Sequence, residues 1–255
     1  MEYGFIPRVC HRVNPSGERN QDATGQLPKI GYQRTLSAEG VLSLDPTVII
    51  GSPEAGPPEV IEQIRGAGVP VVIIPEQRQT IDAAAKIRAV AGALGVAEAG
   101  ETLAVQTEAE INAAIALGAE GTTQPRVLFL YVRGEGTQMI AGAETSADAM
   151  ITAAGGINAG AEAGLTGFQP LTAEALAATQ PDTLVLLSAG LESVGGIDGL
   201  LQIPGISQTP AGENRSVLDF DDLYFLGLGP RTGAALTDLV YGLHPDLAPV
   251  ATPAA

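Results

Sequence analysis

The stretch GYQRTLSAEGVLSLDPTVII, residues 31–50, contains the signals from which the rest of the fold is predicted. Its first part places Tyr32 and Arg34 two residues apart, and on an extended segment such side chains point the same way. Ser37 and Glu39 then form a typical helix start, because a serine caps the first N–H groups and an acid suits the first turn. The stretch therefore predicts a ligand-facing loop or strand end that leads into a short helix.

The residues that follow alternate between short apolar runs and amphipathic runs. The apolar runs at 47–51 (TVIIG) and 69–75 (VPVVIIP) are bounded by turn-forming residues, which is typical of buried parallel strands. Amphipathic patterns at 57–67 and 80–94 predict helices. Because such alternation is typical of a parallel sheet covered by helices, the sequence predicts an α/β fold.

Part of the opening stretch recurs in altered form in the second half of the chain. LSAEGVLSLDPTVII (36–50) and LTAEALAATQPDTLVLL (171–187) share a Leu-Ser/Thr-Ala-Glu start, a helix that ends before a proline, and an apolar run. The longest helical pattern, at 97–117, lies between the two copies. The repeat predicts two similar α/β lobes, and the cleft between such lobes is the usual place for a ligand.

The predicted fold class is α/β, with two Rossmann-like lobes that contain parallel sheets and are joined by a long interdomain helix. The predicted segments are an irregular N-terminal part at 1–27, an N-terminal lobe at 28–96, a connecting helix at 97–118, a C-terminal lobe at 119–244 and a loose tail at 245–255. In the C-terminal lobe we expect strands at 126–132, 183–188 and 216–220, and helices at 146–154, 172–179, 196–202 and 233–243.

The composition argues against several classes of partner and site. The chain has 13 basic and 29 acidic residues and a net charge of −16, so nucleic acid and anionic membrane surfaces are not expected partners. The single cysteine, Cys10, excludes an internal disulfide and a cysteine-rich metal site. The two histidines, His11 and His244, lie near opposite ends without HExxH spacing, which argues against a zinc centre. No apolar run is long enough to span a membrane, and residues 1–27 lack the apolar core of a signal peptide.

Tyr32 and Arg34 form a candidate iron-binding pair. An arginine beside a tyrosine favours the ionised phenolate through its charge and its hydrogen bonds. Phenolate is an anionic ligand that suits ferric iron, including haem iron. The alternative is an ordinary surface tyrosine and arginine at the edge of a strand.

Enzymatic motifs have little support in the sequence. The segment GLGPRTG (227–233) departs from the dinucleotide-binding pattern because its third glycine comes one residue too late, so it predicts a turn and a helix start. No GxSxG pattern occurs, and a Ser-His-Asp arrangement has no suitable histidine.

Glu39 and Glu174 occupy matching positions of the repeat. The favourable interaction of an acid with the helix dipole is enough to explain why each glutamate, taken alone, stands at a helix start. Their symmetry, in contrast, favours an acidic pair that docks onto a two-fold symmetric partner bearing arginines.

Several segments together carry a resemblance to a known family. GYQRTLSAEGVLSLDPTVII resembles the start of the ordered lobe in the haem-binding proteins of bacterial ABC importers, within the cobalamin/siderophore-type class of periplasmic binding proteins. The further similar segments are AGVPVVIIP, RVLFLYVRGEGTQMIAGAETSADAMITAAGGINA, FQPLTAEALAATQPDTLVL and FDDLYFLGLGPRTGAAL. Together they cover residues 28–243, and the tyrosine-x-arginine before Leu-Ser-Ala-Glu-Gly is the specific part.

The resemblance implies a role for each candidate residue. Tyr32 matches the axial ligand of the haem iron, and Arg34 matches the arginine that assists this ligand or a haem propionate. Glu39 and Glu174 match the glutamates that dock into arginine pockets of the permease dimer. Arg133 stands where some members have a histidine as second iron ligand, so it is expected to pair with a propionate. The resemblance thus implies a monomeric carrier of one haem that delivers it to a permease with its ATPase and has no catalysis of its own.

The N-terminal part departs from the family. Members carry a signal or lipoprotein segment and a first βα unit before the opening stretch, and residues 1–27 resemble neither. Either the sequence begins late or out of frame, or this N-terminal lobe lacks the unit. The expected location is the periplasm or the cell surface. The alternatives are a cobalamin or ferric-siderophore carrier of the same class and, from a different class, a cytoplasmic enzyme or regulator on a similar fold.

Overall fold

The computed structural model of the protein describes residues 30–249. These residues divide into two compact units. Unit 1 contains the described residues up to 76 together with 89–96, and unit 2 contains 77–88 and the described residues from 97 onward. The segment predicted at 1–27, with Cys10 and His11, lies outside the described residues, as does the end of the predicted tail.

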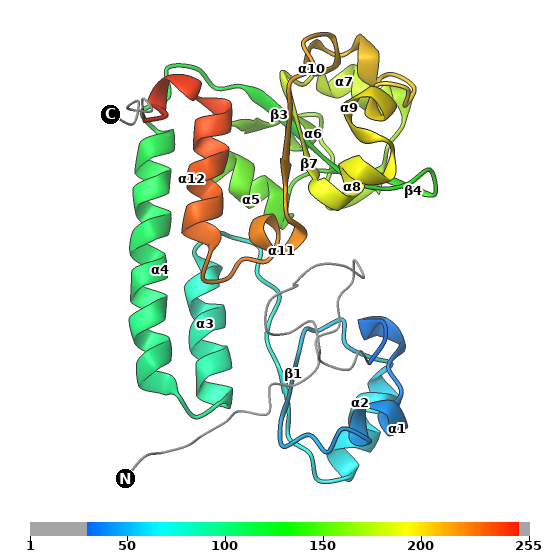
Figure 1. The fold of residues 1–255 in the computed structure, drawn as a ribbon, viewed down its shortest axis with the longest axis vertical. Helices are drawn as coiled ribbons and strands as arrows, with labels where there is room; N and C mark the ends of the chain where they lie inside the picture. Colours follow the sequence, from blue (N-terminus) through cyan, green and yellow to red (C-terminus); the bar gives the residue numbers. More distant parts are fainter. Residues whose placement is uncertain (1–29, 250–255) are drawn as a thin grey trace, which may run out of the picture. The chain divides into compact units, whose positions relative to one another are not determined.

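Unit 1 is a small α/β unit (blue to cyan in Figure 1). Two parallel strands pair side by side, with Ile49 opposite Val71. The helices and strands predicted from the opening stretch onward are confirmed, and Ser37 caps the first helix by accepting a hydrogen bond from the Gly40 N–H at 3.3 Å. The elements are the 3-10 turn η1 (Gln33–Thr35), α1 (Ala38–Leu42), β1 (Ile49–Gly51), α2 (Pro58–Gly66) and β2 (Val71–Ile73).

Unit 2 is built on a six-stranded sheet in the order β6-β4-β3-β7-β8, with β5 paired beside the start of β3. β7 and β8 run parallel to β3, as predicted, but β4 is antiparallel to β3 and β6 is antiparallel to β4. The predicted parallel sheet is therefore mixed at this edge. A tight turn at Gly134, whose φ is 60°, reverses the chain directly after β3, and glycine adopts that conformation readily. The strands are β3 (Arg126–Arg133), β4 (Thr137–Ala141), β5 (Ile157–Asn158), β6 (Phe168–Pro170), β7 (Thr183–Leu187) and β8 (Val217–Phe220).

Helices cover both faces of the large sheet. In Figure 1, α4, α5 and α12 lie on one side of it, and α7, α8, α9 and α10 lie on the other. The short helices α6, α8, α10 and α11 were not predicted, because each has fewer than two turns and no periodic pattern. The helices that involve unit 2 are α3 (Asp82–Ala93, shared with unit 1), α4 (Ala97–Gly118), α5 (Ser146–Ala153), α6 (Ala159–Glu162), α7 (Ala173–Thr179), α8 (Ser188–Ser193), α9 (Gly196–Leu200), α10 (Pro210–Glu213), α11 (Asp222–Phe225) and α12 (Thr232–Leu243), with the 3-10 turns η2 (Ile206–Gln208) and η3 (Pro245–Leu247).

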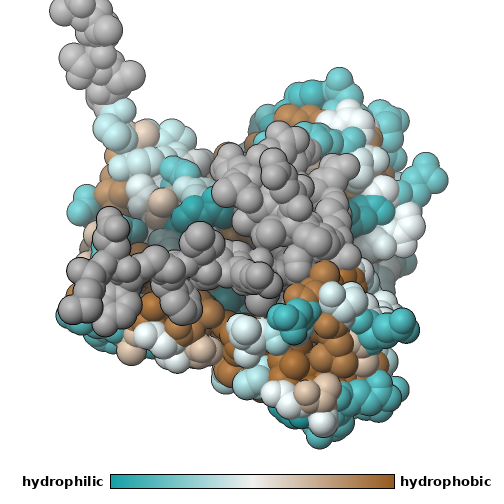
Figure 2. All heavy atoms as spheres, turned by 60° about the horizontal axis from the view of Figure 1, so that its bottom comes forward, coloured by the Kyte–Doolittle hydropathy of each residue, from teal (hydrophilic) through white to brown (hydrophobic). Residues whose placement is uncertain are grey.

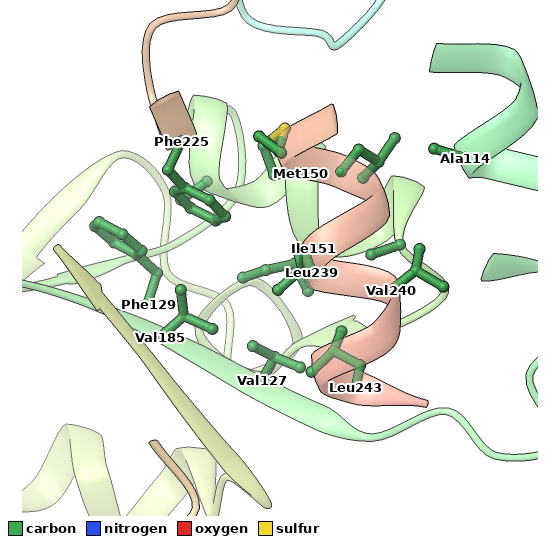
Figure 3. Close-up of a cluster of buried hydrophobic side chains, with 14 of the residues drawn as sticks. Ala114, Val127, Phe129, Met150, Ile151, Val185, Phe225, Leu239, Val240 and Leu243 are labelled. Atoms are coloured by element: carbon green, nitrogen blue, oxygen red, sulfur yellow. The ribbon is translucent and has the colours of Figure 1, made fainter. Parts of the chain in front are cut away.

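Strand β3 lies at the centre of the core of unit 2. On one face its Val127 and Phe129 pack with Val185 of β7 against α5 and α12 (Figure 3). On the other face Leu128 and Leu130 join a second cluster that includes residues of α7, α9 and α10. Burying one such side chain contributes about 1.5–3 kcal/mol, so two buried faces fix the position of this strand firmly.

The helix α4 spans the residues that the sequence predicts for the connecting helix, and it packs against α12 within unit 2. The close approach depends on Gly233 in the first turn of α12, where an added Cβ would lie 2.4 Å from the Cβ of Glu110. The buried positions of α4 are spaced three or four residues apart, as expected for one helix face: Gly100, Ala104, Thr107, Ile111, Ala114 and Gly118.

The described surface carries hydrophobic residues next to hydrophilic ones, as one face shows in Figure 2. The larger hydrophobic side chains that are exposed include Tyr32 in unit 1 and Phe168 in unit 2. Among residues 30–249, no helix combines the length and the hydrophobicity needed to cross a bilayer.

The contact between α4 and α12 gives a prediction about stability. Because Gly233→Ala places a methyl group against Glu110, we expect it to lower the free energy of unfolding by about 1–3 kcal/mol in urea denaturation. Gly92→Ala is the matched control, since nothing lies within 4 Å of a Cβ at that helical position and the helix propensity rises by up to about 1 kcal/mol. Equal effects of the two substitutions would contradict the close approach.

Candidate functional site

Tyr32 is an exposed aromatic residue of unit 1. It precedes the turn η1, its backbone is extended, and 45% of the residue is exposed. Within residues 30–249 its hydroxyl has no hydrogen-bond partner, whereas its carbonyl accepts from the Thr35 N–H at 3.0 Å. Large aromatic residues are buried in most proteins, so an exposed phenol with an unused oxygen is available to a ligand.

Arg34 does not lie on an extended segment with Tyr32, so that part of the prediction is wrong. Residues 33–35 wind into a 3-10 turn, because hydrogen bonds between Gly56 and the backbone of Gln33 and Leu36 hold this segment against a distant loop. The Arg34 guanidinium forms an ion pair with Glu54 at 2.7 Å, and the two side chains are 56% and 49% exposed. Exposed pairs of this kind are worth about 0–1 kcal/mol, so another carboxylate can replace Glu54 at little cost.

Glu39 and Glu174 lie in the first turns of α1 and α7, each on the surface of its own unit. The two helices have the same kind of start, since Thr172 accepts a hydrogen bond from the Ala175 N–H at 3.2 Å just as Ser37 caps α1. Neither glutamate forms an ion pair with another described residue. Both carboxylates are therefore free to meet a partner, and the repeat predicted from the sequence has the expected local form.

Arg133, the last residue of β3, is held by three neighbours in unit 2. Its Nη2 forms a short ion pair with the Asp222 carboxylate, and its Nη1 donates to the Val132 carbonyl at 2.9 Å. The guanidinium also lies 4.7 Å from the centre of the Tyr131 ring, within the range of a cation–π interaction. The Arg133 and Asp222 side chains are only 23% and 18% exposed, so this cation is fixed in place.

Arg133 lies at the end of the sheet where α/β proteins commonly bind ligands. The parallel strands β3, β7 and β8 end at one edge of the sheet, and in α/β proteins ligands bind outside such carboxyl ends. Beside Arg133, the Tyr131 ring packs edge-on against Phe168 with the ring centres 6.1 Å apart, and 37% of Phe168 is exposed. The combination of a cation with partly exposed aromatic rings suits a planar apolar ligand that carries carboxylates.

The segment GLGPRTG forms a turn followed by the start of α12, as predicted. The Lys86 ammonium donates to the Gly227 carbonyl at 2.8 Å, and burial lowers the pKa of this lysine. The Arg231 guanidinium lies 5.4 Å from the centre of the Tyr224 ring. Burial, together with a 2.6 Å hydrogen bond to Asp238, raises the pKa of Tyr224, so this phenol stays protonated at neutral pH and is no candidate for a phenolate ligand.

Sequence reasoning did not single out Tyr131 or Asp222. The signal for Tyr131 was present, because Tyr131-x-Arg133 repeats the pattern of Tyr32-x-Arg34 in the other unit. Asp222 gave no signal, since it is 89 residues away from Arg133 and only the fold brings them together. Among the described residues, no three His, Cys, Asp or Glu side chains gather in a way that would hold a metal ion.

The model of a family described as "Periplasmic binding protein" matches residues 10–224. Among solved structures, the periplasmic heme-binding protein RhuT from Roseiflexus sp. RS-1, in apo form, is 55% identical with a TM-score of 0.85, over 88% of this chain and 86% of that chain. The periplasmic heme-binding protein BhuT, in complex with two hemes, is 43% identical with a TM-score of 0.81, over 90% and 86%. No curated protein sequence matches the chain.

The heme-binding protein HmuT is a third similar structure, with 41% identity and a TM-score of 0.77 over 83% of this chain and 69% of that chain. HmuT has also been solved with a histidine, an arginine or a tyrosine replaced by alanine. In that protein the replaced tyrosine and arginine are two residues apart, and the histidine precedes the tyrosine by the separation that Tyr32 and Tyr131 have here.

Proposed function

The chain belongs to the periplasmic binding protein family, and from that membership we propose that it captures haem and delivers it to the permease of an ABC importer. The observation that supports this proposal most strongly is the 55% sequence identity to a periplasmic heme-binding protein over most of both chains. The similar structures favour haem over cobalamin or a ferric siderophore. The protein acts in the periplasm as a carrier, without catalysis of its own.

Tyr32 is the iron ligand in this proposal. Its exposed phenol oxygen has no partner among the described residues, so binding iron breaks no hydrogen bond there. Phenolate is an established axial ligand for ferric haem. Arg34 lies in the adjacent turn, and it can exchange Glu54 for a haem propionate because both side chains of that pair are exposed.

Tyr131 is a second candidate for the iron ligand, because the spacing of the residues replaced in HmuT draws attention to it. The histidine, tyrosine and arginine replaced in HmuT have the same separations in sequence as Tyr32, Tyr131 and Arg133 have here. Tyr131 also lies beneath a guanidinium that interacts with its ring at 4.7 Å. One haem with Tyr32 as its main ligand remains our expectation, and Arg133 pairs with a propionate.

Glu39 and Glu174 are the docking points for the permease. Each carboxylate is exposed, lies in the first turn of a capped helix and has no ionic partner among the described residues. A symmetric permease dimer that presents arginines, with its ATPase, is the matching partner. We expect the carrier itself to be a monomer.

Titration of the purified protein with hemin tests the ligand assignment. We expect a shifted Soret band in the wild-type protein, and at least about tenfold weaker binding for Tyr32→Phe, because that variant loses the iron-binding oxygen. Tyr241→Phe, in α12, is the matched control and should bind hemin like the wild type. Absence of a Soret shift would refute haem as the ligand of this protein. A Soret shift that is the same in Tyr32→Phe would refute Tyr32 as the iron ligand.

Transport into proteoliposomes that contain the permease and its ATPase tests the docking assignment. Glu39→Ala combined with Glu174→Ala should abolish haem transport and leave hemin binding unchanged, since neither carboxylate forms a hydrogen bond or ion pair with a candidate ligand residue in the described structure. Glu62→Ala with Glu213→Ala removes two other exposed acids, one from each unit, and should transport normally. Normal transport by the first double variant would refute the docking role.

A further inference from the structure

We infer that Asp222 is the resident counter-ion of Arg133, with which a carboxylate of the bound porphyrin competes, so that Asp222 sets the affinity for the carboxylates of the ligand. The inference rests on the proposed function and concerns unit 2 alone. It assigns a specificity-determining role to a residue that does not itself bind iron.

The geometry makes Asp222 the principal partner of Arg133. The Asp222 carboxylate accepts from Nη2, while the backbone carbonyl of Val132 takes Nη1 and the ring of Tyr131 lies against the face of the guanidinium. No other carboxylate pairs with Arg133 among the described residues. A propionate that binds this cation therefore competes with the charge of Asp222.

The local structure of α11 leaves Asp222 free for this task. The preceding residue, Asp221, caps the helix by accepting from the N–H groups of Leu223 and Tyr224 at 3.2 and 3.1 Å. The side chain of Asp222 has no capping role, and its one described side-chain partner is Arg133. Two adjacent aspartates thus have two different functions.

Because of burial, the resident carboxylate competes with a propionate more strongly at Arg133 than at Arg34. The Arg133–Asp222 pair is less than one quarter exposed, whereas both side chains of the Arg34–Glu54 pair are about half exposed. Charges that are partly shielded from water interact more strongly than exposed ones. Displacing Asp222 is consequently more costly than displacing Glu54.

Exchange of one carboxylate for another also suits a carrier that has to release its ligand. Arg133 keeps an anionic partner with and without ligand, so that its partly buried charge is never left uncompensated. The resident carboxylate weakens binding at this point and helps a propionate to leave.

The test compares hemin with hemin dimethyl ester, which lacks the carboxylate charges. Asp222→Asn removes the competing charge in a similar volume, and we expect it to bind hemin about threefold to tenfold more tightly and the ester unchanged. Asp219→Asn removes the same charge from an exposed site on β8 and should change neither affinity. In an Arg133→Gln background, Asp222→Asn should give no gain for hemin.

Several outcomes would overturn the inference. Weaker or unchanged hemin binding by Asp222→Asn, an equal gain for the ester, or an equal gain for Asp219→Asn would each do so. Asp222→Ser is a second neutral variant and should show the same gain in hemin affinity. If only one of the two Asp222 variants folds, a loss of hemin affinity in that variant counts against the inference. If wild-type protein binds hemin through Tyr32 while these variants show no gain, the inference fails and the proposed function stands. If the wild type binds no hemin, both fail.

Discussion

The burial of β3 on both faces is the constraint on which the rest of unit 2 depends. Alternate side chains of this strand enter two separate hydrophobic clusters, one beneath α5 and α12 and the other beneath the helices of the opposite layer. A shift by one residue would exchange the two faces, so the register is strongly fixed. The same constraint places Tyr131 and Arg133 on one face at the carboxyl end of the strand, where Asp222 meets the guanidinium.

The fold was predictable where local sequence patterns decide it. The apolar runs of β1, β2, β3, β7 and β8 indicated parallel strands, and the family resemblance is confirmed by the match over residues 10–224. The antiparallel β4 and β6 were missed, because β4 has no continuous apolar run and Phe168–Pro170 is exposed along its whole length. Their place depends on a glycine turn and on pairing between distant segments, which a local pattern does not reveal.

The candidate site was likewise predictable where neighbouring residues decide the structure, and not where distant segments meet. Helix caps use neighbouring residues, so the positions of Glu39 and Glu174 in first turns followed from the sequence. The conformation around Arg34 did not, because Gly56 and Glu54, more than fifteen residues further along, determine the turn and the ion pair. The pairing of Arg133 with Asp222 depends on the fold alone. The roles of these residues in haem capture remain predictions.

Resonance Raman spectroscopy of the ferric hemin complex tests the central claim most directly, because it detects a phenolate bound to iron. We predict an iron–phenolate vibration in the wild-type complex and in Tyr131→Phe, and its loss in Tyr32→Phe. A vibration that survives in Tyr32→Phe and disappears in Tyr131→Phe would contradict Tyr32 as the ligand of the haem iron.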